Sequence, residues 1–396
     1  MTTGEKSIEL HREKRGKISI QSKVPLRDKW DLSLAYTPGV AAVSLAVAKD
    51  KALTYELTAR GNLIAVVSDG SAVLGLGNIG PEGALPVMEG KAILFKELGG
   101  VDAVPICLDT QDSQEIISIV KALIPTFGGF NLEDISAPRC FEIEEALMDI
   151  GVPVFHDDQH GTAIVVLAAL SNALNLVGKS LKDVKIVFSG AGAGGIAVAR
   201  LLMTAGARNI ILVDSRSAIH TGREDLTPVK MEMAKTTNPA GEKGSLSNVM
   251  RGADVFVGVS VRDLVSVEDV RGMANKAIVF AMANPDPEIL PSQAIAGGAA
   301  IVGTGRSDFP NQINNVLAFP GVFRGALDIR ATKITVEMKM AAARALAAIL
   351  PEPTVDMILP SPLDRSVAPI VAKAVGEAWS ESQQAATTKG AAGVRR

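Results

Sequence analysis

A glycine-rich turn between an apolar strand and a helix constrains the fold of this chain more than any other feature. Residues 185–214 read KIVFSGAGAGGIAVARLLMTAGARNIILVD, so a short apolar run leads into closely spaced glycines and then into a helical pattern. Such glycines permit a tight turn, a close approach of backbone to pyrophosphate, and close packing of helix on strand. The amino terminus of the helix then faces the phosphate charge. The residues expected to line a dinucleotide are Gly190, Ala191, Gly192, Ala193, Gly194 and Gly195.

An acidic residue follows the first glycine at the usual distance for a nucleotide site. Asp214 lies 24 positions after Gly190, at the end of the next apolar run, where its carboxylate can hold ribose hydroxyls. That placement favours NAD. Arg216, two residues on, can instead bind a 2′-phosphate. A glycine-rich turn without nucleotide is the alternative interpretation. The cofactor is therefore expected to be NAD or NADP, with the choice open.

Short apolar runs alternate with longer helical patterns along the whole chain. The strand-like runs are NLIAVVS from residue 62, VDAVPICLD from 101, VKIVFSG from 184, NIILVDS from 209 and KAIVFAMANP from 276. Continuous apolar strands alternating with helices predict an α/β fold with largely parallel sheets. At 396 residues the chain exceeds one ordinary core, so two domains are expected. We place them at residues 1–160 and 161–380, joined near an all-round apolar helix at 161–177, with a disordered polar tail at 381–396.

Composition excludes several classes of protein. The net charge is −3, so no basic surface is expected to neutralise a run of phosphates, and nucleic acid is not an expected partner. No apolar run reaches the roughly 18 residues of a membrane span, and the amino terminus is polar. Two cysteines, Cys107 and Cys140, provide neither a disulfide framework nor metal spacing. A protein of the cytoplasm that does not bind membranes is expected.

Two acidic doublets stand beside buried segments: Glu133-Asp134 in GGFNLEDIS and Asp157-Asp158 in VPVFHDDQHGTA. Carboxylates are rarely placed there unless something positive compensates them. Neighbours on a regular strand point to opposite faces, so both members of a doublet can bind one ion only where the backbone leaves strand geometry. Oxygen ligands suit Mg²⁺ or Mn²⁺. Helix caps and surface acids are the alternative. A zinc site at the flanking His156 and His160 is disfavoured, because no thiolates accompany them.

Two further residues are ambiguous on their own. Lys91 lies in PVMEGKAILFKELGG, an apolar helical segment where a lysine often only extends to solvent. Tyr36, in LAYTPGV, is one of two tyrosines and by default an ordinary core residue.

Taken together, the segments resemble the malic enzyme family. The matching pieces are AYTPGV from residue 35, VVSDGSAVLGLGNIGP from 66, EGKAILFK from 89, NLEDI from 131, FHDDQHGTA from 155, the GAGAGG turn, MANPDPE from 282 and NNVLAFPGVFRGALD from 314. They occur in family order over about residues 30–375 and look like the short bacterial form. The resemblance implies an amino-terminal malic-type α/β domain that holds substrate and metal, followed by a Rossmann-like, doubly wound NAD(P)-binding domain.

The resemblance also implies roles for individual residues. Tyr36 matches the family's general acid, Lys91 its general base, and Asp157 the acid that pairs with that lysine. The residues that match the metal ligands are Glu133, Asp134 and Asp158. Those that match asparagines near nicotinamide and substrate are Asn284 and Asn315, with Asn314 beside them. Where larger members carry an arginine for a malate carboxylate, this chain has Ser71 and Ala72.

The implied reaction is oxidative decarboxylation of L-malate to pyruvate and CO2, with reduction of NAD or NADP and a divalent metal; decarboxylation of oxaloacetate is a second expected activity. The resemblance further implies a homodimer, in which Tyr36 of one subunit can serve its neighbour's site. Alternatives are another metal-dependent hydroxy-acid dehydrogenase, a malolactic-type enzyme that releases lactate and retains NAD, and a nucleotide-binding protein without catalysis.

Overall fold

Two parallel sheets organise the computed structural model, which describes residues 2–73 and 76–393. The strands of the first sheet, in the order β2-β1-β3-β4, are β1 (Leu63–Ser68), β2 (Asp102–Cys107), β3 (Gly129–Leu132) and β4 (Val154–His156). Those of the second, in the order β6-β5-β7-β8-β9, are β5 (Lys185–Ser189), β6 (Asn209–Val213), β7 (Val255–Gly258), β8 (Ile278–Ala281) and β9 (Ile301–Thr304). The expected α/β fold with two parallel sheets is confirmed.

Helices cover both faces of the first sheet because its strands are apolar on both faces. Ala65 and Val67 of β1 face α6 (Ser113–Leu123) and α7 (Arg139–Leu147). Ile64 and Val66 face the opposite way, toward α5 (Gly80–Gly99) and α14 (Phe319–Asp328). Continuous apolar strands of this kind are typical of doubly covered parallel sheets.

The second sheet is covered in the same manner. One face packs against α8 (Asp157–Val177) and α9 (Ala193–Thr204). The other packs against α11 (Leu246–Met250), α12 (Val267–Arg271) and α13 (Pro291–Ala296). The remaining helix of this part is α10 (Pro228–Thr236). Strand order 2-1-3-4-5 within this sheet is that of a doubly wound fold.

The buried helix α8 joins the two parts. Most of its residues are buried, as its all-round apolar sequence predicts, and it packs against α9 and α15 (Val336–Ala348). Residue 160, where we placed the domain boundary, falls in the first turn of this helix. Helix α14 packs back on α5, with the Phe95 and Phe319 ring centroids 4.6 Å apart. Residues 319–328, which belong to the predicted second domain, thus pack against the predicted first domain. A single boundary near residue 160 therefore stays a prediction.

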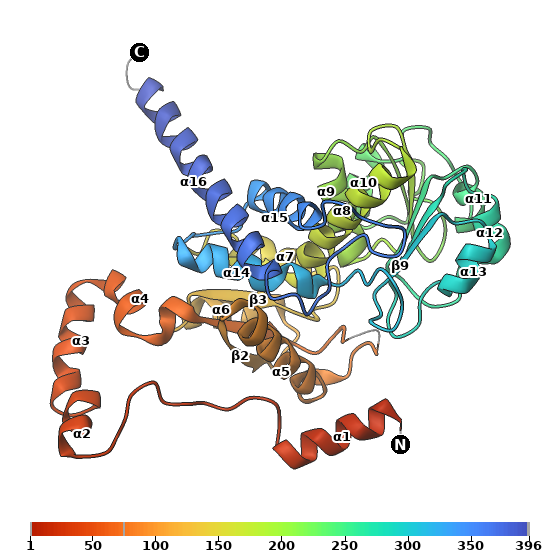
Figure 1. Cartoon of the computed structure of the whole chain (residues 1–396). Coiled ribbons are helices and arrows are strands. Elements are labelled where there is room, and N and C mark those ends of the chain that lie inside the picture. The colour runs from red at the N-terminus through yellow and green to blue at the C-terminus, as the bar shows by residue number, and fades with distance from the viewer. Residues whose placement is uncertain (1, 74–75, 394–396) are drawn as a thin grey trace.

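The carboxyl-terminal segment differs from our expectation. Helix α16 runs Val367–Gly393, so most of the segment expected to be a disordered tail is helical (Figure 1). Its eight alanines and two glutamines have high helix propensity, which a prediction based on small polar residues underrates.

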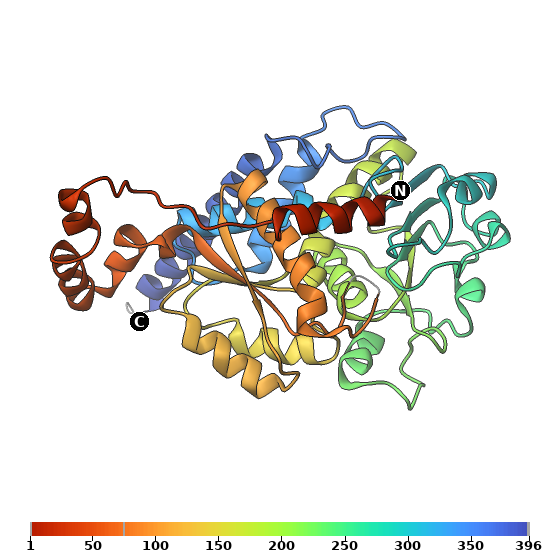
Figure 2. The same cartoon turned by 90° about the horizontal axis from the view of Figure 1, so that it is seen from below.

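An amino-terminal arm stands apart from both sheets in Figure 1, whereas in Figure 2 its first helix, beside the N label, crosses in front of the rest of the chain. It comprises α1 (Thr3–Lys14), α2 (Lys29–Ala35), α3 (Gly39–Lys49) and α4 (Thr54–Leu57), none of which has a buried residue, with the short 3₁₀ turns Lys51–Leu53 and Ala59–Asn62. The expectation that no apolar run reaches the length of a membrane span is wrong. Two stretches are long and apolar enough by length and composition alone, Lys29–Lys49 and Asp157–Val177. The second is the core helix α8. The first is divided into α2 and α3 around Tyr36, Thr37 and Pro38.

Candidate functional site

The expected site residues gather where parallel strands end. In each sheet the strand order reverses beside the first strand, between β1 and β3 and between β5 and β7. Loops at the carboxyl ends diverge at such a point and leave room for a ligand. Glu133 and Asp134 follow β3, and Gly190 follows β5. The fold thus places the acidic doublet and the glycine-rich turn at equivalent positions of two sheets.

Lys91 is buried in the middle of α5 and paired with two carboxylates. Its Nζ lies 2.6 Å from Asp157 Oδ2 and 3.0 Å from Glu133 Oε1. It also lies 4.3 Å from the centroid of the Phe319 ring. The lysine does not extend to solvent, because only 8% of it is exposed. The structure therefore brings Lys91 together with the acidic residues that the sequence singled out.

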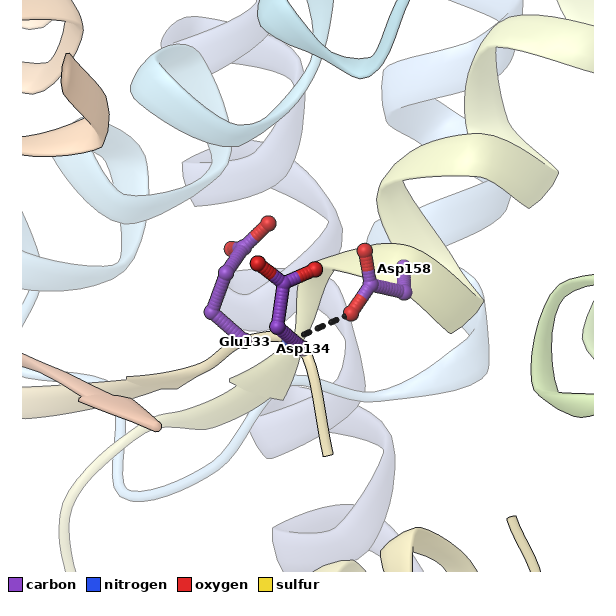
Figure 3. A group of neighbouring side chains, drawn as sticks. All are labelled: Glu133, Asp134 and Asp158. Atoms are coloured by element: carbon purple, nitrogen blue, oxygen red, sulfur yellow. Dashed lines mark hydrogen bonds between the residues drawn. The ribbon is translucent and has the colours of Figure 1, made fainter. Parts of the chain in front are cut away.

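Glu133, Asp134 and Asp158 converge from two elements (Figure 3). One carboxylate oxygen of each lies within 4.8 Å of those of the other two. Asp134 has a φ of 55°, so the backbone leaves strand geometry at the second member of the doublet, as the sequence argument required. The Asp134 amide donates to Asp158 Oδ2 at 2.8 Å, which links the two doublets directly. Asn131 Nδ2 donates to Glu133 Oε2 at 2.7 Å.

The carboxylates of this cluster are largely buried, and the single positive charge of Lys91 does not compensate all of them. Burial raises the pKa of Glu133 to about 7 and that of Asp158 to about 6, against the lowering effect of Lys91. Burial likewise raises the pKa of Asp157 to about 7. For Lys91 burial lowers the pKa, but Asp157, Glu133 and Asp158 outweigh it and raise the pKa above its ordinary value.

Four carboxylates around a single ammonium leave an excess of negative charge in a buried place. Such an arrangement fits a divalent cation with oxygen ligands, which would supply the missing positive charge. His156 and His160 are not part of the three-residue cluster. His160 Nε2 instead lies 2.6 Å from Glu144 Oε1, and His156 is fully buried. A packing or outer role suits both histidines better than zinc ligation.

The asparagines are distributed over different places. Asn315 begins a 3₁₀ turn, Asn315–Leu317, and its Cβ lies against Gly161 of α8, beside the acidic cluster. Asn314 caps this turn by accepting from the Val316 amide at 3.0 Å and lines a separate cavity of about 830 Å³. Asn284 is exposed in the loop after β8 and lies against Gly305.

Tyr36 is not brought to the cluster within one chain. It ends α2 in the amino-terminal arm and is 67% exposed. In the described parts of the chain no hydrogen bond joins its hydroxyl to Lys91 or to the acidic residues. The default expectation of a core tyrosine is wrong, since the side chain is not in the core.

The glycine-rich turn has the form expected of a pyrophosphate cradle. A Cβ at Gly195 would lie 2.0 Å from Gly190 O, so the third glycine permits the helix to meet the turn. A Cβ at Gly192 would meet no atom within 4 Å, because that position faces open space. Gly192 precedes α9 without any side-chain cap, so the first amides of the helix face this space. A cavity of about 670 Å³ extends from here to Asp214 and Ser260.

Asp214 is held more tightly than the sequence indicated. Its carboxylate accepts from Arg223 Nη1 at 2.8 Å and from Lys230 Nζ at 2.7 Å, as well as from the amides of Arg216 and Ser217. Although burial acts in the opposite direction, these donors hold the pKa of Asp214 well below its usual range. Arg216 is turned to Asp225, with Nη1 and Oδ2 2.9 Å apart.

Sequence reasoning missed several residues of these sites. Arg223 and Lys230 follow Asp214 by 9 and 16 positions, a spacing that has no periodic signal. Glu288 is fully buried and accepts from the amides of Ser260 and Ala283 at 2.9 and 3.1 Å, and thereby ties the ends of β7 and β8 together. Its place in MANPDPE, directly after a predicted strand, was the available signal.

Comparison with known proteins identifies similar chains. Residues 15–116 match a family model described as malic enzyme, N-terminal domain, and residues 159–379 match malic enzyme, NAD binding domain. The bifunctional malic/malolactic enzyme of Bacillus subtilis is 55% identical over 98% of this chain and 96% of that protein. The NADP-dependent malic enzyme of Halomonas elongata is 46% identical over 93% and 91%. The crystal structure of an NAD-dependent malic enzyme from Thermotoga maritima superposes with a TM-score of 0.91, at 48% identity, over 93% and 98%.

Proposed function

This chain belongs to the malic enzyme family, and on that premise we propose that it converts L-malate to pyruvate and CO2 while reducing NAD or NADP. The observation that carries the proposal is the position of Lys91, 2.6 Å from Asp157 and 3.0 Å from Glu133, beside the convergent carboxylates of Asp134 and Asp158. A base and a site for a hard cation are thus side by side.

Each residue has a part in this reaction. Glu133, Asp134 and Asp158 would hold Mg²⁺ or Mn²⁺, which would supply Lewis-acid chemistry, and the bound nicotinamide cofactor would supply the redox chemistry. Lys91 takes the proton of the C2 hydroxyl, and Asp157 orients it. Lys91 can do so only when neutral, and a divalent cation bound by the neighbouring carboxylates would oppose the raised pKa that these carboxylates give it. After CO2 leaves, Tyr36 donates a proton to C3.

Substrate and cofactor are held by the surrounding loops. Asn315, beside Gly161, is the asparagine best placed to bind the substrate; Asn284 is the candidate on the nicotinamide side, and Asn314 is the weaker one because its side chain already caps a turn. With Ser71 and Ala72 in place of an arginine, the carboxylates of malate depend on these amides and on the metal. The six residues Gly190, Ala191, Gly192, Ala193, Gly194 and Gly195 form the pyrophosphate cradle.

The experiment is an assay of malate with Mn²⁺ or Mg²⁺ and either cofactor. We expect reduced cofactor and pyruvate in equal amounts, and loss of turnover after chelation that added Mn²⁺ restores. Absence of malate-dependent reduction with both cofactors and both metals would overturn the proposal. Decarboxylation of oxaloacetate involves no reduction of the cofactor and is measured by the release of pyruvate. It should require the same metal.

We propose further that both NAD and NADP bind. A free carboxylate at the end of the second strand repels a 2′-phosphate, but Asp214 is neutralised by Arg223 and Lys230. Together with Arg216 and Asp225, the five groups carry one net positive charge. Replacing Lys230 or Arg216 by Ala should weaken binding of 2′,5′-ADP about 10- to 100-fold, with a smaller effect on AMP. Lys235→Ala, an exposed lysine on the same helix, is the control.

The arm suggests how Tyr36 reaches a site. Trp30, Leu34 and Leu45 are 59–72% exposed on α2 and α3, an unusual amount of apolar surface. We propose that the arm packs on a second subunit and supplies Tyr36 to it, in a homodimer. Mixing Tyr36→Phe with Lys91→Ala subunits tests this: random pairing should restore roughly a quarter of wild-type activity, because each mixed dimer has one intact site. No recovery after confirmed subunit exchange would contradict shared sites.

A malolactic conversion is the second candidate, favoured by the similarity to the bifunctional relative. It would release lactate with no net cofactor reduction, so the ratio of NADH to malate consumed separates the two outcomes. Location in the cytoplasm, expected from Cys107 and Cys140, stays a prediction; both cysteines are free.

A further inference from the structure

A buried network outside the carboxylate cluster connects the loop after β1 to the turn that carries Glu133 and Asp134. Asp69 and Ser71 lie in that loop and are 1% and 7% exposed. Asp69 Oδ1 accepts from the amide of Ser71 at 3.0 Å and from its hydroxyl at 2.6 Å. The aspartate therefore fixes both the backbone and the hydroxyl of Ser71.

Ser71 then reaches across to the acidic turn. Its Oγ accepts from the amide of Ser136 at 2.9 Å, and the next amide, that of Ala72, donates to Asp134 O at 2.9 Å. These two bonds bracket residues 134–136. Asp134 has a φ of 55°, a left-handed backbone conformation that non-glycine residues adopt infrequently, and its own carbonyl accepts the second of these bonds.

Arg139, at the start of α7, closes the network. Its Nη1 lies 2.8 Å from Asp69 Oδ2 and 2.5 Å from Gln111 O, and its Nη2 donates to Ser71 Oγ at 2.9 Å and to Ser136 Oγ at 3.1 Å. Both terminal nitrogens are therefore engaged with the protein. This arginine is arranged to hold two loops together and not to receive a substrate carboxylate.

We propose that Asp69, Ser71 and Arg139 are positioning residues that hold the Glu133-Asp134 turn in its metal-binding conformation. The inference rests on the metal site proposed above. None of the three belongs to the carboxylate cluster of Glu133, Asp134 and Asp158; they act by fixing the backbone of these residues. Partners of this kind contribute to metal affinity because a ligand that has to be ordered on binding binds more weakly.

The test measures Mn²⁺ binding to the full chain by electron paramagnetic resonance, with NAD binding measured in parallel. Ser71→Ala and Arg139→Ala should each weaken Mn²⁺ binding about 10- to 100-fold while NAD affinity is unchanged. Ser71→Thr, which keeps the hydroxyl, should retain most of the affinity. The double variant should lose no more Mn²⁺ affinity than the single variant with the larger loss, because each substitution breaks the same network. The controls are Ser171→Ala on α8, which removes a hydroxyl that donates to Leu167 O of the same helix, and Arg200→Ala, which removes a surface ion pair with Glu232.

Wild-type Mn²⁺ affinity in folded Ser71→Ala and Arg139→Ala would overturn the proposal, and so would losses that multiply in the double variant. If Ser71→Ala does not fold, Arg139→Lys decides: it keeps the charge beside Asp69 but not the fork, and unchanged affinity would again overturn the proposal. Asp158→Asn separates this from failure of the metal site. If Asp158→Asn loses Mn²⁺ binding but Ser71→Ala and Arg139→Ala keep it, only the positioning role is overturned. If all three variants bind Mn²⁺ as the wild type does, the proposed metal site is overturned and this inference with it.

Discussion

The carboxylate of Asp157 occupies the space that a side chain at residue 161 would need. A Cβ at Gly161 would lie 1.8 Å from Asp157 Oδ1 and 3.0 Å from Asn315 Cβ. The two residues are one helical turn apart on the same face of α8. Because Asp157 Oδ2 is turned to Lys91, Oδ1 is left over the helix backbone, and only glycine leaves room for it. Gly161 is thus required by the ion pair and not by the helix.

Gly161→Ala should separate activity from stability. Alanine is the better helix former by roughly 1 kcal/mol, so helix propensity alone predicts a more stable protein. The added Cβ instead displaces Asp157 and misplaces Lys91, and we expect turnover to fall about 10²-fold with NAD affinity retained. Steady-state kinetics and fluorescence titration with NADH measure both. Ser171→Ala, further along the same helix, should be near wild type. Full turnover in Gly161→Ala would mean that Asp157 can move without cost.

Lys91→Ala should abolish malate oxidation and keep cofactor binding. Removal of a proton-transfer group typically costs 10²–10⁴-fold. The substitution also leaves the buried Asp157 and Glu133 without their ammonium. Turnover and NAD affinity are the measurements, and near-normal turnover would remove Lys91 as the base.

Tyr36→Phe should impair protonation of the pyruvate enolate more than hydride transfer. The measurement compares the rate with malate and the rate with oxaloacetate. If both rates fall equally, Tyr36 has a broader role.

Two glycines of the cofactor turn should respond differently to alanine. At Gly195 the Cβ would collide with backbone, 2.0 Å from Gly190 O, so Gly195→Ala should lower both the melting temperature and cofactor affinity. At Gly192 nothing lies within 4 Å, so Gly192→Ala should melt as wild type does and lose affinity only through contact with the ligand. Thermal unfolding with and without NAD measures the difference. Equal melting temperatures without NAD in the two variants would contradict the collision at Gly195.

Lys339 should give the stability a dependence on alkaline pH. Burial lowers its pKa to about 8, against the opposing effect of Glu144, from a reference value of 10.5. Between these values the unfolded chain binds one proton more than the folded chain, so the free energy of unfolding rises with pH. Below pH 8 both states are protonated and the cost of the buried charge is present in full.

Two thiols oppose this rise at higher pH. Burial raises the pKa of Cys107 to about 11 and that of Cys140 to about 12, so each lowers stability as the pH exceeds its reference value of 9.0. Glu133 and Asp157, whose pKa burial raises to about 7, also lower stability as the pH rises to that value. The comparison is therefore between two proteins: urea unfolding of the reduced forms at pH 8 and 9 should show the wild type gaining stability relative to Lys339→Met. The same pH dependence in both proteins would show that Lys339 keeps its ordinary pKa.

Local patterns predicted the strands and the glycine-rich turn well, because both are encoded within a few residues. The apolar runs from residues 62, 101, 184, 209 and 276 became β1, β2, β5, β6 and β8. Four strands were not among these runs, namely β3, β4, β7 and β9, because three or four residues give only a short signal. Strand β8 is as short, but it lies within the longer apolar run from residue 276. The final helix was missed because polar composition was weighed above helix propensity.

The sequence alone determined the α/β class, the dinucleotide turn and the two acidic doublets, since each follows from residue order and periodicity over a short span. Tertiary structure decided which charges meet. Lys91 and Asp157 are 66 residues apart, Asp69 and Arg139 are 70 apart, and Asp214 is neutralised by Arg223 and Lys230 from the segment that follows it. No local pattern specifies these pairs, because they exist only where packing of separate elements brings buried groups into a low-dielectric interior and each charge needs a partner.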